Sequence, residues 1–243
     1  MFGKQIQLFR LFGFPIRVDA SWLVVAALAT WSLASGYFPL RLPGLSPSTY
    51  WAMGVAGALG LFAAIVVHEM FHALVARRNG IPMRGITLFI FGGVAEMTGE
   101  PRDAKAELLM AAAGPFASIL IALACYALAL AGRNTWPTPI TAVLGYLAVI
   151  NAVLAGFNLL PAFPLDGGRI FRAILWRWKG DLRRATQTAA RVGAGFSVLF
   201  MALGVVSFVG GDFISGVWWF LIAMFLRQAA IASSQQIAPG AAR

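Results

Sequence analysis

The segment VVHEMFH, residues 66–72, places the only two histidines of the chain and a glutamate inside a long apolar stretch. On a helix, His68 and His72 are four residues apart, so both imidazoles lie on one face and reach a single metal ion. Glu69 lies beside the first histidine and can accept a proton from water, whose pKa a bound zinc ion lowers toward about 7. The spacing therefore predicts a hydrolytic zinc site.

The alternative interpretation of this segment is a pair of hydrogen-bonded core histidines beside a chance glutamate. An unpaired carboxylate in a membrane span costs at least about 2.5 kcal/mol, and ionisable groups at that depth usually have a function. This cost favours the metal site.

A catalytic zinc ion takes three protein ligands and keeps one position open. The chain has no third histidine, and most of its nine acidic residues lie at the ends of apolar runs. Asp166 is different because it lies within the apolar pattern, in the helix-breaking segment FNLLPAFPLDGGR. Asp166 is the candidate third ligand, and its alternative role is to cap a helix at a proline-kinked turn.

The composition predicts the class of protein that must position these residues. Hydrophobic residues make up 60% of the 243 residues and charged residues only 12%, about half the charged share of a soluble domain. Several runs are long enough to cross a bilayer. We expect an all-α polytopic membrane protein, a single integral-membrane domain over residues 1–243, with six transmembrane helices at residues 20–38, 51–76, 108–131, 140–178 (broken at 161–168), 192–209 and 213–231. Asp19 and Asp212 are placed to cap the first and last of these helices.

Two short segments have the composition of β-strands rather than helices. One is IQLFRLFGFPIRVD near the N-terminus, and the other is IPMRGITLFIFGGVAEMTGEP between spans two and three. In the second segment we expect a strand from Ile86 to Phe91, followed by a turn at Gly92 and Gly93. One interpretation is that this is simply a tight turn that needs a positive φ. The functional interpretation is that the strand offers an open edge to an unwound substrate, with contacts from Ile86, Leu88, Ile90, Gly92 and Gly93.

The formal charge of +10 is distributed unevenly along the chain. With six spans, nearly all basic residues fall on one side of the membrane, which the positive-inside rule makes cytoplasmic for both termini. His68 lies nine residues before Arg77, about 13 Å from that end of its helix, and Asp166 lies eleven residues before Arg177. The ligands therefore reach similar depths near the cytoplasmic face of a cell membrane. A nucleic-acid partner is not expected, since no basic patch lies on a separate polar domain.

The combination of HExxH with N-x-x-P-x-x-x-L-D-G-G resembles the site-2 protease family of intramembrane zinc metalloproteases, peptidase family M50. The segments IRVDASW, FGGVAEM and AAAGPFAS are also similar to that family. The resemblance implies one Zn²⁺ held by His68, His72 and Asp166, with Glu69 as the general base. It also implies that Asn158 lies near the site and stabilises developing negative charge, although a helix–helix hydrogen bond is an equal alternative.

The resemblance further implies regulated intramembrane proteolysis of transmembrane substrates, such as proteins of the anti-sigma or pro-sigma factor type. The match is to the compact branch of the family, with no PDZ domain and no CBS domains expected in this chain. Two other functions would use similar features. A metal transporter should carry polar residues along a whole pathway, whereas this chain clusters them at one depth. A scaffold for transmembrane helices would not need Glu69.

Overall fold

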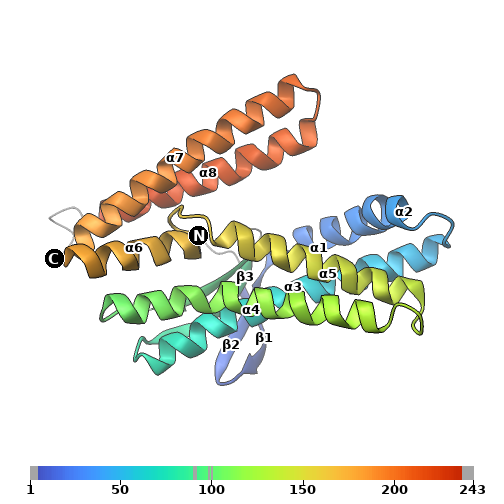
Figure 1. Cartoon of the computed structure of the whole chain (residues 1–243), viewed down its shortest axis with the longest axis horizontal. Helices are drawn as coiled ribbons and strands as arrows, with labels where there is room; N and C mark the ends of the chain where they lie inside the picture. The colour runs from blue at the N-terminus through green and yellow to red at the C-terminus, as the bar shows by residue number, and fades with distance from the viewer. Residues whose placement is uncertain (1–4, 90–91, 98, 100, 237–243) are drawn as a thin grey trace. The chain divides into compact units, whose positions relative to one another are not determined.

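Helices form most of the part of the chain that the computed structural model describes, which is residues 5–89, 92–97, 99 and 101–236 (Figure 1). The helices are α1 (Ala20–Ser32), the π-helical turn η1 (Leu33–Tyr37), α2 (Phe38–Arg41), α3 (Pro47–Arg78), α4 (Ala104–Ala131), α5 (Thr138–Asn158), α6 (Asp166–Lys179), α7 (Leu182–Val209) and α8 (Phe213–Gln236). The strands are β1 (Gln5–Leu11), β2 (Phe14–Asp19), β3 (Met83–Phe89) and β4 (Gly92–Met97).

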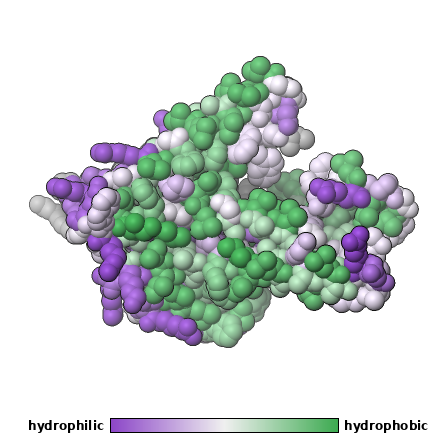
Figure 2. Space-filling model, in the orientation of Figure 1, coloured by the Kyte–Doolittle hydropathy of each residue, from purple (hydrophilic) through white to green (hydrophobic). Residues whose placement is uncertain are grey.

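Five helical segments are long and apolar enough to cross a membrane: residues 20–41, 47–78, 104–131, 138–158 and 182–209. Hydrophobic residues cover much of the visible helix surface in Figure 2, and hydrophilic residues gather near helix ends. Both features are those of a multi-pass membrane protein. The predicted sixth span forms α8, which begins at Phe213 as expected, but it is not among the five candidates found in the described residues. The count of six spans stays a prediction.

The predicted helix starts agree with the observed elements, and the predicted break agrees in part. Asp19 accepts a hydrogen bond from the Ser21 backbone N–H at 2.9 Å, and Asp212 accepts one from the Ser215 backbone N–H at 3.1 Å. Hydrogen bonds from the side chain and backbone of Ser215 lower the pKa of Asp212. The fourth predicted span is interrupted, because α5 ends at Asn158 and α6 begins at Asp166. The predicted break at 161–168 ends too late, since residues 166–168 form the first turn of α6.

The four strands form one sheet in the order β1-β2-β3-β4. The outer pairs are antiparallel, and β2 pairs with β3 in parallel through Ile16 and Ile86. The prediction that the strand beginning at Ile86 has an open edge is therefore wrong for the described residues, since β3 has a hydrogen-bonded neighbour on each side. The N-terminal segment occupies the edge of β3, and the edge strands of this sheet are β1 and β4.

The chain forms two compact units, one of Met1–Pro101 with Ala113–Gly156, and one of Arg102–Ala112 with Phe157–Arg243. In the first unit, β2 and β3 pack on the second half of α3 through Phe14, Ile16 and Ile86 against Met70 and Ala73. This contact holds the sheet against the helix turns that carry the two histidines.

The second unit contains α6, α7 and α8. Its core joins the segment between α5 and α6 to the α7–α8 pair, through Ala162, Leu165, Phe200, Ala223 and Leu226. The prediction of one integral-membrane domain over residues 1–243 stays a prediction.

Candidate metal centre

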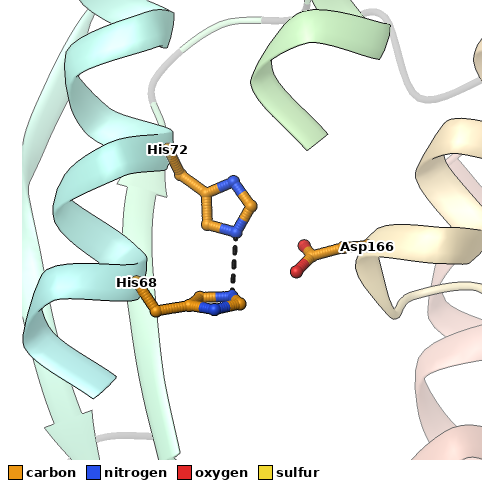
Figure 3. A group of neighbouring side chains, drawn as sticks. All are labelled: His68, His72 and Asp166. Carbon is orange, nitrogen blue, oxygen red and sulfur yellow. Dashed lines mark hydrogen bonds between the residues drawn. The ribbon is translucent and has the colours of Figure 1, made fainter. Parts of the chain in front are cut away.

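The two histidines project from adjacent turns of α3 and approach each other edge to face, as Figure 3 shows. Their Nε2 atoms lie 3.1 Å apart, and only 7% and 8% of the two residues is exposed. Two ligand nitrogens on one tetrahedral zinc ion would lie about 3.3 Å apart, given Zn–N bonds of about 2.0–2.1 Å. The pair therefore fits a shared metal ion with little rearrangement.

Ser118 of α4 fixes the orientation of the first imidazole. Its hydroxyl lies 2.9 Å from Nδ1 of His68, and 2% of the residue is exposed. When Nδ1–H donates to the serine oxygen, the lone pair is left on Nε2, the nitrogen that faces His72. Histidine ligands of metals commonly have a hydrogen-bond partner of this kind on the second ring nitrogen.

Gly114 of α4 lies directly against both rings. A Cβ atom at this position would overlap the Nε2 atoms of His68 and His72, so only glycine allows the helix so close. The absence of a side chain at Gly114 leaves room for the two imidazoles. Glycine and serine are ordinary residues of an apolar helix, so Gly114 and Ser118 carry no local signal for this role. In the sequence they lie four residues apart in the segment AAAGPFAS, whose similarity to the family did not by itself indicate this role.

Glu69 is half-buried on α3 and lies against the beginning of β4. A Cβ atom at Gly93 would come within 2.6 Å of Cγ of Glu69 and 3.1 Å of Ile65. Gly93 therefore provides space for the glutamate side chain. This finding corrects the predicted turn, because Gly92 and Gly93 pair with Phe89 and Leu88 as strand residues. No positive φ is found at Gly93.

The other predicted substrate-contacting residues lie in different surroundings. Ile86 and Leu88 are buried, with exposed fractions of 0% and 3%, so their side chains face the core. Ile90 lies outside the described residues. A role of these residues in substrate binding is not tested by the structure.

Asp166 is the first residue of α6 and is half-buried. The N-cap is Leu165, so Asp166 does not fill the capping role that the sequence left open. Negative charge is favoured in the first turn of a helix, which stabilises a carboxylate there. Gly167 and Gly168 follow it, and a Cβ atom at either would collide with the backbone of the preceding segment.

Two asparagines lie in or at the end of α5. Asn158 is its last residue and is half-buried. Its predicted role near the site stays a prediction. Asn151 was not singled out from the sequence, yet it is 1% exposed and donates from Nδ2 to the Leu147 carbonyl at 2.8 Å. Its Oδ1 has no hydrogen-bond partner among the described residues.

Known proteins with similar sequences include ones named as zinc metalloproteases. A family model described as peptidase family M50 matches residues 56–134 and 129–202. The Mycobacterium tuberculosis protein named "Putative zinc metalloprotease Rip3" is 42% identical over 242 residues, which cover 97% of this chain and 61% of that protein. A zinc metalloprotease of Methanocaldococcus jannaschii is 32% identical over 206 residues, which cover 84% of this chain and 55% of that protein.

The fold is similar to a solved structure as well. The site-2 protease from Methanocaldococcus jannaschii superposes with a TM-score of 0.62 and 28% sequence identity, and the match covers 95% of each chain. The present chain spans about three-fifths of the length of the first curated relative. The family model covers more than half of the chain, and the curated relatives match nearly all of it, so the chain belongs to peptidase family M50.

Proposed function

We propose that this chain is an intramembrane zinc endopeptidase that hydrolyses peptide bonds in or near the transmembrane segments of its substrates. The observation that carries the proposal is the pair of buried Nε2 atoms 3.1 Å apart on an apolar helix, with Ser118 bonded to one ring. Two imidazoles whose Nε2 atoms face each other at this distance on one helix face can bind one metal ion together.

The proposed ligands are His68, His72 and Asp166. Two imidazoles and one carboxylate are the donor set of zinc hydrolases that keep a fourth position open. When bound, the ion would supply a Lewis acid that lowers the pKa of water and polarises the substrate carbonyl. Asp166 brings a negative charge that offsets part of the ion's charge in a medium that solvates ions poorly.

Glu69 is the proposed general base. It follows a ligand directly in the chain, and its side chain occupies the space beside Gly93. Its carboxylate would take a proton from the attacking water and deliver it to the nitrogen of the leaving peptide. Asn158 would donate its side-chain N–H to the oxygen on which negative charge develops.

The substrate is proposed to bind as an extended strand along β4. Peptide bonds in a helix are shielded by their own hydrogen bonds, so hydrolysis requires local unwinding. Strand addition would then satisfy the exposed backbone groups. β4 is an edge strand of the sheet, and Gly93 touches Glu69, so a peptide paired there would run beside the proposed base.

The proposed setting follows from the charge distribution. With both termini cytoplasmic, the site would lie within the bilayer toward the cytoplasmic side of the cell membrane. Substrates would be membrane proteins of the anti-sigma or pro-sigma factor type, cut in regulated intramembrane proteolysis.

Metal removal tests the function directly. The purified chain in lipid vesicles should cleave a co-reconstituted single-span substrate, lose cleavage after treatment with a zinc chelator, and recover it when Zn²⁺ is returned. Cleavage by metal-free protein at the rate of the zinc-loaded protein would contradict the proposal. Tight zinc binding with no cleavage of any membrane-spanning substrate would favour a metal carrier or a scaffold.

Replacing Ser118 by Ala should weaken zinc binding without removing it. Loss of the hydrogen bond to Nδ1 frees the His68 ring to rotate, and loss of such a partner typically lowers metal affinity about 10- to 100-fold. Competition with a chromophoric chelator measures the change. Ser197→Ala is the matched control, because this buried hydroxyl on α7 bonds the Ala194 carbonyl of its own helix. Equal affinities for Ser118→Ala and the parent would exclude the orienting role.

A further inference from the structure

The second unit contains a buried ion pair that none of the proposed chemistry uses. Arg172 of α6 donates from both Nε and Nη2 to the same carboxylate oxygen of Glu107, with the Nε–Oε1 distance 2.7 Å. The side chain of Glu107 is fully buried, and that of Arg172 is 13% exposed. The second carboxylate oxygen of Glu107, Oε2, has no hydrogen-bond partner among the described residues.

Such a pair is weak evidence for stability. Removing two charges from water costs about as much as their attraction returns, and an apolar pair of the same volume is often equally stable. The pair does restrict the position of Arg172 relative to the first turn of α4. Glu107 lies in the first turn of α4, so the contact ties α6 to a segment that lies far away in sequence.

The same guanidinium makes a third contact. Its Cζ lies 5.0 Å from the ring centroid of Phe163, in the range of a cation–π interaction. Phe163 belongs to the segment between α5 and α6, three residues before Asp166. Arg172 therefore connects α4, α6 and the segment that leads into the proposed metal ligand.

The backbone of Phe163 is closely packed between two helices. A Cβ atom at Gly168 of α6 would collide with its nitrogen, and one at Gly193 of α7 would collide with its carbonyl oxygen. On either side, Ala162 and Leu165 are buried against Phe200 and Leu226. The ring and the backbone of this one residue are thus held by α6 and α7 together.

These contacts determine where α6 begins and how it is rotated about its axis. Arg172 lies six residues after Asp166, about 9 Å along a rigid helix. The helix is held at Arg172, and the preceding segment is held at Phe163. Asp166, the first residue of the helix, lies between these two contacts. A rotation of α6 would turn the Asp166 carboxylate away from its position.

We propose that Glu107 and Arg172 are positioning residues that hold the Asp166 carboxylate in place for metal binding, with Phe163 as the contact that transmits the constraint. The inference rests on the proposed role of Asp166 as a ligand. It concerns orientation, so it predicts weaker zinc binding in a protein that is still folded.

The test is a double-mutant cycle on zinc affinity, measured by chelator competition in detergent. Arg172→Lys keeps the charge beside Glu107 but loses the planar fork and its stacking face. It should weaken zinc binding about 10- to 100-fold, as loss of an outer partner does. In the Asp166→Ala background the same substitution should change the affinity by no more than about twofold, since its effect acts only through Asp166.

A second variant keeps the test valid if Arg172→Lys fails to fold. The pair Glu107→Gln with Arg172→Met removes both charges at similar volume and leaves no unpaired buried charge, and it should behave as Arg172→Lys does. The matched control is Arg184→Lys, because the Arg184 side chain is 80% exposed in a surface pair with Asp181 and should leave zinc affinity unchanged.

The outcomes separate the inference from the function on which it rests. Equal losses in the Asp166 and Asp166→Ala backgrounds would overturn the positioning role, because the pair would then act on the fold in general. Unchanged affinity in both Arg172→Lys and the neutral pair would overturn it too. If Asp166→Ala by itself binds zinc as tightly as the parent, the proposed ligand set fails instead.

Discussion

Replacing Glu69 by Gln is expected to lower the rate of peptide hydrolysis by at least about a hundredfold while zinc remains bound. A positioned general base contributes about 10²- to 10⁴-fold to such a reaction. Glutamine has the same shape and fits the space beside Gly93, but it cannot accept the proton of the attacking water. The measurement is cleavage of a single-span substrate in vesicles, together with the zinc content of the same preparation.

The matched control for this change is Asp212→Asn, another replacement of a carboxylate by its amide. Asp212 accepts the Ser215 backbone N–H at the start of α8, and asparagine caps a helix equally well. This variant should cleave at the parent rate. If zinc-loaded Glu69→Gln also cleaves at the parent rate, Glu69 is not the base, and another residue must move the proton.

Replacing Asp166 by Ala is expected to weaken zinc binding by more than about a hundredfold. Loss of a residue that only hydrogen-bonds to a metal ligand lowers metal affinity about 10- to 100-fold, and loss of a ligand itself should cost more. Two imidazoles remain in this variant, so residual binding should come from His68 and His72. Elemental analysis of the purified variant and chelator competition measure the loss. Hydrolysis should fall with the zinc content.

Asp181→Ala is the matched control for Asp166→Ala, because it removes an aspartate that caps a helix and is not a proposed ligand. Asp181 is the N-cap of α7 and accepts the Arg184 backbone N–H at 3.0 Å. Its loss should cost about 1 kcal/mol of stability, as other N-cap substitutions do. The zinc content should stay at the parent value. Equal zinc content in Asp166→Ala and in the parent would remove Asp166 from the ligand set.

Local patterns explain why much of the fold could be predicted. Long apolar runs predicted the helices that became α1, α3, α4, α5 and α7, and breakers between Asn158 and Asp166 predicted the interruption before α6. These features depend on neighbouring residues and on helix periodicity, which are visible in a single sequence. The predicted boundaries differ most where α7 begins, at Leu182 and not near Val192, because its first turns are polar and carry no membrane signal.

Contacts between distant segments could not be predicted in the same way. The expected open edge at Ile86 is covered because β2, from the N-terminal segment, pairs with β3 in parallel. Gly93 was expected in a turn, but it is a strand residue, and its lack of a side chain makes room for Glu69. A glycine needed for space and a glycine needed for a positive φ are identical in a sequence.

The sequence by itself determined the chemistry of the first half of the site. The i, i+4 spacing of His68 and His72 places both rings on one face of any helix, whatever surrounds it. Only the tertiary structure decided that Ser118 orients His68 and that Gly114 packs against both rings. It also decided that Arg172 meets Glu107 across 65 residues. The reason is physical: helix geometry is set by local backbone bonds, whereas these contacts depend on which helix faces meet, and no period in the chain encodes that.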